Sequence, residues 1–191
     1  EQIKKGLAKL KPLPGRLSIE KGPLDSILLN DSLRANPAST LAGLQTLADL
    51  PSGGKDLVFS FSVKTRSSKK VAVLGEMGEL GDSAQQEHQQ IGQQVAELKI
   101  DYFVGIGPLQ KLAVEQALKS GMRKEQVFWA KDVFQAAQIL KKILKKDDLF
   151  YLKGSLLRHM ERIILLLKNQ KLDCKVISCH NYNRCDVCPK L

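Results

Sequence analysis

Four short polar clusters in this sequence carry residue types that can bind charged ligands. They are residues 30–36, 75–81, 105–107 and 153–155. Each cluster follows an apolar run, and ligands of open α/β sheets bind at the carboxyl ends of the strands. The clusters are therefore expected to converge on one rim. Each has a structural alternative, because Asp31 could cap a turn, Gly105 and Gly107 could tighten one, and Lys153 could be a surface lysine.

A second group that could do chemistry is a set of four cysteines near the end of the sequence. Cys174, Cys179, Cys185 and Cys188 are the only cysteines and follow the pattern Cys-x4-Cys-x5-Cys-x2-Cys. A Cys-x2-Cys knuckle is a good half-site for tetrahedral zinc, whereas Cys-x4-Cys is a looser spacing. We expect one structural zinc ion bound by the four thiolates, with His180 as the substitute if Cys179 points away. Free thiols and disulfides are the alternatives, and a reducing cytoplasm disfavours the disulfides.

Several catalytic signatures are missing from the sequence. It has no Gly-x4-Gly-Lys-Ser/Thr loop to cradle a triphosphate, and Gly105-x-Gly107 lacks the third glycine of a dinucleotide fingerprint. It has no Gly-x-Ser-x-Gly elbow of a serine hydrolase, and His88 and His159 lie in helical patterns where packing or surface roles are expected. Any ATP chemistry must therefore be shared with another domain.

The segments that position these clusters alternate between strand-like and helix-like patterns. Short runs that are apolar on both faces predict buried parallel strands, and apolar residues at helical spacing predict helices between them. The predicted strands are 26–29, 71–74, 102–106, 127–129 and 149–152, and the predicted helices are 37–50, 83–98, 109–120, 133–144 and 156–167. This pattern predicts an α/β fold with a Rossmann-like, doubly wound, mostly parallel sheet, helices on both faces and a small cysteine-rich tail.

Local signals set some boundaries of these elements. Asn36 before Pro37 predicts a helix N-cap, Asp82 predicts the N-cap of the next helix, and Gly121 predicts the end of the third helix. Residues 58–63 alternate with period two, which predicts an edge strand or hairpin before the strand at residue 71.

The composition fits a packed domain that binds small anions. The chain has 191 residues, is 43% hydrophobic and 26% charged, and carries a net charge of +10. It is too apolar for a disordered chain, and no apolar run approaches the ~18 residues of a membrane-spanning helix. The first residues do not resemble a signal peptide and begin with Glu1, so we expect a piece of a longer cytoplasmic protein. The lysines are scattered and aromatics are few, which makes nucleic acid an unlikely partner.

Taken together, the motifs resemble the C-terminal domain of the Mur ligases. The resemblance is carried by residues 13–16 (LPGR), 30–39 (NDSLRANPAS) and 74–81 (LGEMGELG), and by Lys153-Gly154-Ser155 with Glu161. It covers about residues 3–168. Mur ligases are ATP-dependent amide ligases of three domains. In them ATP phosphorylates a carboxylate, and an amine then attacks the acyl phosphate.

This resemblance implies that the chain is the third domain of a ligase of peptidoglycan precursor synthesis. Residues 1–22 would be the hinge and the end of the central ATPase domain, residues 23–170 the C-terminal domain, and residues 171–191 the cysteine-rich tail. The substrates would be a UDP-MurNAc-peptide and D-alanyl-D-alanine or an amino acid. ATP and Mg²⁺ would be held mostly by the central domain, which would also explain the missing phosphate loop.

The resemblance also implies roles for single residues. Arg16 and Asp31 are expected to touch ATP when the domains close. Asn36, Lys153 and Ser155 are expected to line the side that receives the incoming amine.

The family usually has an arginine directly after Lys-Gly-Ser, where this chain has Leu156. Arg158 lies one turn further along and could bind substrate in its place or be solvated. Two other functions stay open. One is another ligase of the superfamily, of the folylpolyglutamate or cyanophycin synthetase type. The other is a non-catalytic module whose zinc knuckle binds a protein or a nucleic acid.

Overall fold

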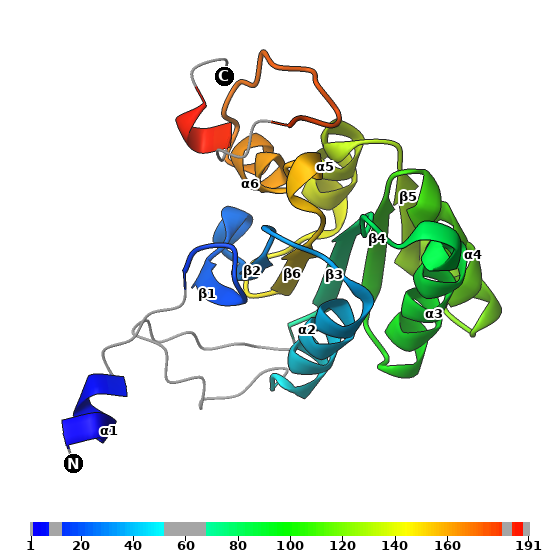
Figure 1. The fold of residues 1–191 in the computed structure, drawn as a ribbon, viewed down its shortest axis with the longest axis horizontal. Coiled ribbons are helices and arrows are strands. Elements are labelled where there is room, and N and C mark those ends of the chain that lie inside the picture. The colour runs from blue at the N-terminus through cyan, green and yellow to red at the C-terminus, as the bar shows by residue number, and fades with distance from the viewer. Residues whose placement is uncertain (1, 8–12, 52–67, 181–184, 189–191) are drawn as a thin grey trace.

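A six-stranded sheet lies at the centre of the computed structural model, which describes residues 2–7, 13–51, 68–180 and 185–188. The strand order is β1-β2-β6-β3-β4-β5 (Figure 1). The strands are β1 (Ser18–Lys21), β2 (Ile27–Asp31), β3 (Lys70–Gly75), β4 (Tyr102–Ile106), β5 (Val127–Ala130) and β6 (Leu149–Lys153). Strand β1 pairs antiparallel with β2, and all other neighbours are parallel. The prediction of a mostly parallel α/β sheet is confirmed.

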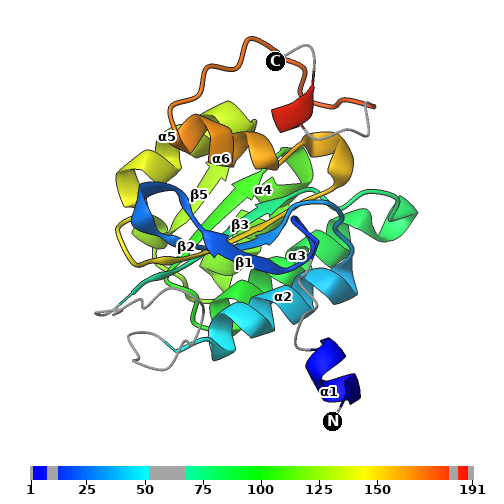
Figure 2. The same cartoon turned by 90° about the vertical axis from the view of Figure 1, so that its left-hand side faces the viewer.

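Helices cover both faces of this sheet, as predicted. Helices α2 (Pro37–Asp49), α3 (Ala84–Glu97) and α4 (Pro108–Lys119) pack on one face, and α5 (Val133–Ile143) and α6 (Glu161–Leu167) pack on the other. Figure 2 shows α5 and α6 above the sheet and α2 and α3 beneath it. A short helix, α1 (Gln2–Leu7), lies before the sheet in the chain.

Each face of the sheet contributes to its own hydrophobic cluster. Along β6, Leu149 and Tyr151 belong to the cluster under α2, α3 and α4, whereas Phe150 and Leu152 belong to the cluster under α5 and α6. Side chains alternate between the two faces of a strand, so a strand between two helix layers is apolar throughout. This packing holds the strand ends, and therefore the rim, in place.

Two of the three predicted helix boundaries are confirmed. The Asn36 side chain accepts the Ser39 N–H at 2.8 Å and caps α2. Gly121, with φ +100°, follows α4, and the N–H groups of Gly121 and Met122 bond back to its last turn. The prediction for Asp82 is wrong, because residues 81–83 form a 3₁₀ turn and α3 begins at Ala84.

The last predicted helix, residues 156–167, is interrupted. Leu156–Arg158 form a 3₁₀ turn, His159 has a left-handed backbone with φ 47°, and α6 begins only at Glu161. A left-handed residue cannot continue a right-handed helix. The predicted edge strand at residues 58–63 lies outside the described residues.

Within the described ranges, no helix combines the length and the apolar character that crossing a membrane requires.

Candidate functional site

The polar clusters converge on one rim, as the sequence predicts. The Ser155 N–H donates to the Glu76 carbonyl at 3.1 Å and joins the loop after β6 to the loop after β3. The Gln110 side chain donates to the Gly75 carbonyl at 2.8 Å and joins the start of α4 to the same loop. The backbone of Gly154 packs closely against the Met160 side chain. A Cβ at residue 154 would lie 2.5 Å from Met160 Cγ, so glycine is required at this position.

A buried ion pair joins the ends of β2 and β6. Asp31 and Lys153 are partners in the register of these parallel strands, and Lys153 Nζ donates to Asp31 Oδ2 at 2.5 Å. The ammonium also donates to the Arg34 carbonyl at 2.8 Å. The second carboxylate oxygen accepts the Leu17 N–H at 3.2 Å. The structure thus brings together two residues for which the family resemblance implies different ligands, ATP for Asp31 and the incoming amine for Lys153.

Burial changes the pKa of two groups bonded to Asp31, the Lys153 ammonium and the Tyr151 hydroxyl. Burial lowers the pKa of Lys153, the bond to Asp31 opposes this change, and the positive charge of Arg16 lowers the pKa further. Burial also raises the pKa of Tyr151, whose hydroxyl donates to Asp31 at 3.4 Å. Arg16 itself is exposed, so its guanidinium is available to an anion.

Asn36 and Ser155 have local roles in the fold. Asn36 caps α2, and its amide is exposed at the rim. Ser155 is partly exposed, and its carbonyl accepts the Arg158 N–H at 2.9 Å. Neither role prevents a contact to substrate.

A second ion pair links Glu76 to Arg158. Glu76 Oε1 also accepts the Leu109 N–H at 2.9 Å, which places a carboxylate at the N-terminus of α4, where negative charge is favourable. The Arg158 side chain remains 36% exposed, so part of its guanidinium faces solvent. Glu76 belongs to one of the sequence motifs, but no role was predicted for it.

A pocket lies beside this second pair, over the ends of β3, β4 and β5. Its lining includes Glu76, Gly107, Lys131, Asp132, Arg158 and Ile177. The Asp132 side chain accepts the Gln135 N–H at 2.9 Å and caps α5. Lys131 and Asp132 were not predicted as site residues, although they directly follow a predicted strand, which is the same signal that identified the other clusters.

Both histidines within the fold are buried, which fits the packing role and not the surface role among the two that were expected. His88 Nε2 accepts the Met77 N–H at 3.1 Å, its Nδ1 contacts the Ala84 carbonyl at 2.6 Å, and burial lowers its pKa. His159 Nδ1 lies 2.9 Å from Glu161 Oε1. Each ring thus holds together parts of the loops near the rim.

The cysteine-rich tail folds back onto the start of α6. The Arg162 guanidinium donates to Cys185 Sγ at 2.9 Å and to Cys174 Sγ at 3.5 Å. The Cys179 N–H donates to the Leu157 carbonyl at 3.0 Å. Burial raises the pKa of the Cys185 thiol, and Arg162 opposes the rise.

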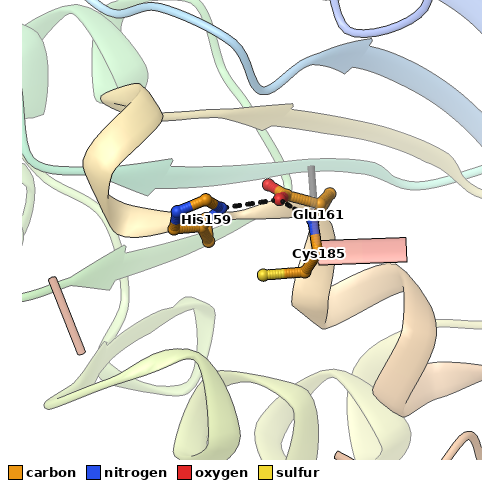
Figure 3. Close-up of side chains that lie close together, drawn as sticks. All are labelled: His159, Glu161 and Cys185. Carbon is orange, nitrogen blue, oxygen red and sulfur yellow. Dashed lines mark hydrogen bonds and ion pairs between the residues drawn. The ribbon is translucent and has the colours of Figure 1, made fainter. Parts of the chain in front are cut away.

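The described part of the chain contains one cluster of three possible metal ligands, formed by His159, Glu161 and Cys185 (Figure 3). It shares Cys185 with the predicted four-cysteine zinc site. That predicted site stays a prediction.

Two bacterial proteins of the same name are among the relatives of this chain. UDP-N-acetylmuramoyl-tripeptide–D-alanyl-D-alanine ligase of Bacillus subtilis is 30% identical over 164 residues, which are 86% of this chain and 33% of the relative. The protein of the same name from Escherichia coli is 34% identical over 107 residues, which are 56% of this chain and 20% of the relative. The chain therefore spans a third or less of the length of these relatives.

Solved structures agree with the fold. MurF from Acinetobacter baumannii superimposes with a TM-score of 0.69 and 29% identity over 87% of this chain and 33% of its own. MurF from Thermotoga maritima, crystallised with ADP, has the same fold, with a TM-score of 0.63 and 22% identity over 86% of this chain and 33% of its own. The family model described as "Mur ligase, glutamate ligase domain" matches residues 15–156. The chain therefore belongs to the Mur ligase family.

Proposed function

We propose that this chain is the C-terminal domain of a cytoplasmic ATP-dependent ligase that joins D-alanyl-D-alanine, or an amino acid, to a UDP-MurNAc-peptide. The observation that carries the proposal is the convergence of two charged pairs, Asp31 with Lys153 and Glu76 with Arg158, on one rim of the sheet. The activity named for the Bacillus and Escherichia relatives supports it.

The pocket beside Arg158 suits a small zwitterion. Arg158 and Lys131 would attract the carboxylate of the incoming dipeptide, and Asp132 would attract its ammonium. The N-termini of α4 and α5 lie at the same pocket and favour negative charge. Asn36, Lys153 and Ser155 would line the other side of the bound amine. These contacts would hold the amine in the orientation needed to attack the acyl phosphate, which lowers the entropic cost of the reaction.

ATP would be bound mainly outside this chain. The family's reaction phosphorylates the precursor carboxylate, and positive charge must balance the phosphoryl group as it moves. Arg16 is exposed and close enough to Lys153 to lower its pKa, so it could reach a phosphate when the domains close. Asp31 would also contact ATP after closure, and it would then give up its present bonds to Lys153 and the Leu17 N–H. The central ATPase domain would hold Mg²⁺ and most of the nucleotide, and residues 1–22 would connect to it.

The test uses the full-length ligase that contains this chain and measures phosphate release that depends on D-alanyl-D-alanine. Arg158→Gln should raise the KM for the dipeptide about 10- to 100-fold, because one charge-assisted hydrogen bond is lost. Lys119→Gln removes one charge at the opposite end of α4 and should leave this KM unchanged.

One result would contradict the whole proposal, and another would contradict only the role of Arg158. A full-length protein that releases no phosphate with any UDP-MurNAc-peptide and amine is not this ligase. An unchanged KM in Arg158→Gln would remove Arg158 from the amine pocket and leave the assignment of the domain intact.

A further inference from the structure

Three side chains of different chemistry point toward one another where the tail meets α6 (Figure 3). His159 ends the turn after β6, Glu161 is the first residue of α6, and Cys185 begins a 3₁₀ turn of the tail (Cys185–Val187). One ligand atom from each of the three lies within 4.8 Å of the others. The tail and the rim loop therefore meet at a single cluster.

The cluster is shielded from water. The side chains of His159 and Glu161 are 2% and 5% exposed, and Cys185 is 2% exposed. Buried groups of this kind are costly unless they are bonded or bind a metal. The three are arranged around one carboxylate oxygen, because Glu161 Oε1 contacts His159 Nδ1 at 2.9 Å and accepts the Cys185 N–H at 3.0 Å. The ring nitrogen of His159 that faces the cluster is Nδ1, which lies toward Glu161 in Figure 3, and the other nitrogen, Nε2, is buried and has no hydrogen-bond partner among the described residues.

We propose that His159, Glu161 and Cys185 bind one zinc ion, with Cys188 as the fourth ligand. Imidazole nitrogen, carboxylate oxygen and thiolate sulfur are the three ligand types that zinc takes in tetrahedral sites. Cys188 belongs to the Cys-x2-Cys knuckle that begins with Cys185, and its N–H donates to the Cys185 carbonyl at 3.2 Å. This turn brings the backbones of the two cysteines close together.

Charge balance supports this set of ligands. Two thiolates and one carboxylate carry three negative charges, and the zinc ion supplies two positive charges. Arg162 supplies the third, because it already donates to the Cys185 sulfur at 2.9 Å. A donor to a ligand atom in this position fixes the orientation of the ligand.

The ion would join the tail to the loop that carries the rim residues. His159 follows Arg158 directly, and Ile177 of the tail lines the pocket beside Arg158. A zinc ion at the cluster would therefore hold the tail and the loop that carries Arg158 next to each other. The ligand set differs from the four-cysteine prediction by using His159 and Glu161 in place of Cys174 and Cys179.

The first test replaces zinc with Co²⁺ in the unmodified chain. The charge-transfer absorption of tetrahedral Co²⁺ grows with the number of thiolates, so the cluster should give the intensity of two thiolates. The intensity of four thiolates would overturn the proposal in favour of the four-cysteine site. This measurement needs no variant and therefore does not depend on how a variant folds.

The second test measures the zinc content of chain purified from zinc-containing medium. Wild-type protein should hold about one ion per chain, as a structural zinc site does. Glu161→Gln, His159→Ala and Cys185→Ser should fall far below this, with circular dichroism confirming that each is folded.

Cys174→Ser and His180→Ala are matched controls outside the proposed ligand set, and both should keep the ion. Zinc lost in Cys174→Ser but kept in folded Glu161→Gln would contradict the proposal. So would wild-type chain that binds no stoichiometric zinc.

Discussion

Water hardly reaches the charged pair between Asp31 and Lys153, whose side chains are 13% and 2% exposed. Such a pair adds little net stability, because the cost of desolvating both charges offsets their attraction. Loss of one partner is different, since the other charge is left buried and unpaired. Asp31→Asn should therefore lower the free energy of unfolding by about 3–5 kcal/mol, measured by urea denaturation.

Two comparisons make this prediction specific. Asp31→Asn combined with Lys153→Met removes both charges and should recover most of the loss. Asp25→Asn breaks the exposed pair with Lys21 and should cost no more than about 1 kcal/mol. If Asp31→Asn lowers the free energy of unfolding as little as Asp25→Asn does, the pair of Asp31 and Lys153 behaves as a solvated pair and the prediction is wrong.

His88 should make the fold sensitive to acid. Its ring is fully buried, Nε2 accepts the Met77 N–H, and burial lowers its pKa below the ordinary value of 6.5. The unfolded chain keeps the ordinary pKa, so below about pH 6.5 the unfolded state takes up the proton first. The contribution of His88 to stability is therefore complete above that pH and is lost as the pH falls toward the lowered value.

The measurement is the free energy of unfolding between about pH 7.5 and pH 5 for wild type and His88→Gln. Glutamine does not titrate, so the wild type should lose more stability on acidification than the variant does. Parallel pH profiles of the two proteins would show that His88 does not contribute to the pH dependence.

Five strands of the sheet could be predicted because their sequences are apolar on both faces, as in Val71 to Leu74. Strand β1 was missed because its sequence, Ser-Ile-Glu-Lys, has one apolar residue and lies at the edge of the sheet. The break at His159 was missed because its neighbours keep a helical spacing, while the left-handed backbone depends on tertiary contacts. Gly92 belongs to an Ile-Gly pair of the family motif, but its packing role could not be derived from the sequence, because it depends on α4: a Cβ there would lie 2.0 Å from the Ala113 carbonyl.

Asn36 combines a structural and a proposed binding role, and two variants separate them. Asn36→Ala removes the cap of α2 and should lower the free energy of unfolding by about 1 kcal/mol. Asn36→Ser keeps a capping oxygen and should be close to wild type in thermal denaturation, although it lacks the amide. If the amide binds the incoming amine, the KM for that substrate should rise in Asn36→Ser of the full-length ligase. An Asn36→Ser variant with unchanged KM would leave Asn36 with its capping role alone.

Across the whole molecule, the sequence could predict that polar clusters meet on a rim but not which residues pair there. The pairing depends on strand order, because β6 lies between β2 and β3. Lys153 is thereby placed opposite Asp31 on one side and opposite Leu74 on the other. Alternating strands and helices are compatible with several strand orders, so this contact could not be derived from the sequence.

The residues of the rim also predict how the isolated chain interacts with ATP. The sequence has no phosphate loop, and two of the basic groups at the rim already have carboxylate partners, Lys153 with Asp31 and Arg158 with Glu76. Arg16 is exposed, and one exposed arginine gives little affinity for a hydrated triphosphate.

The isolated chain should therefore bind Mg-ATP with a Kd weaker than about 1 mM in calorimetry and release no phosphate. Arg16→Ala should not differ from wild type in this assay, although it should slow the full-length ligase if Arg16 contacts the phosphate there, as proposed. Phosphate release by the isolated chain, or micromolar binding that Arg16→Ala abolishes, would show that the nucleotide site is complete without the central domain.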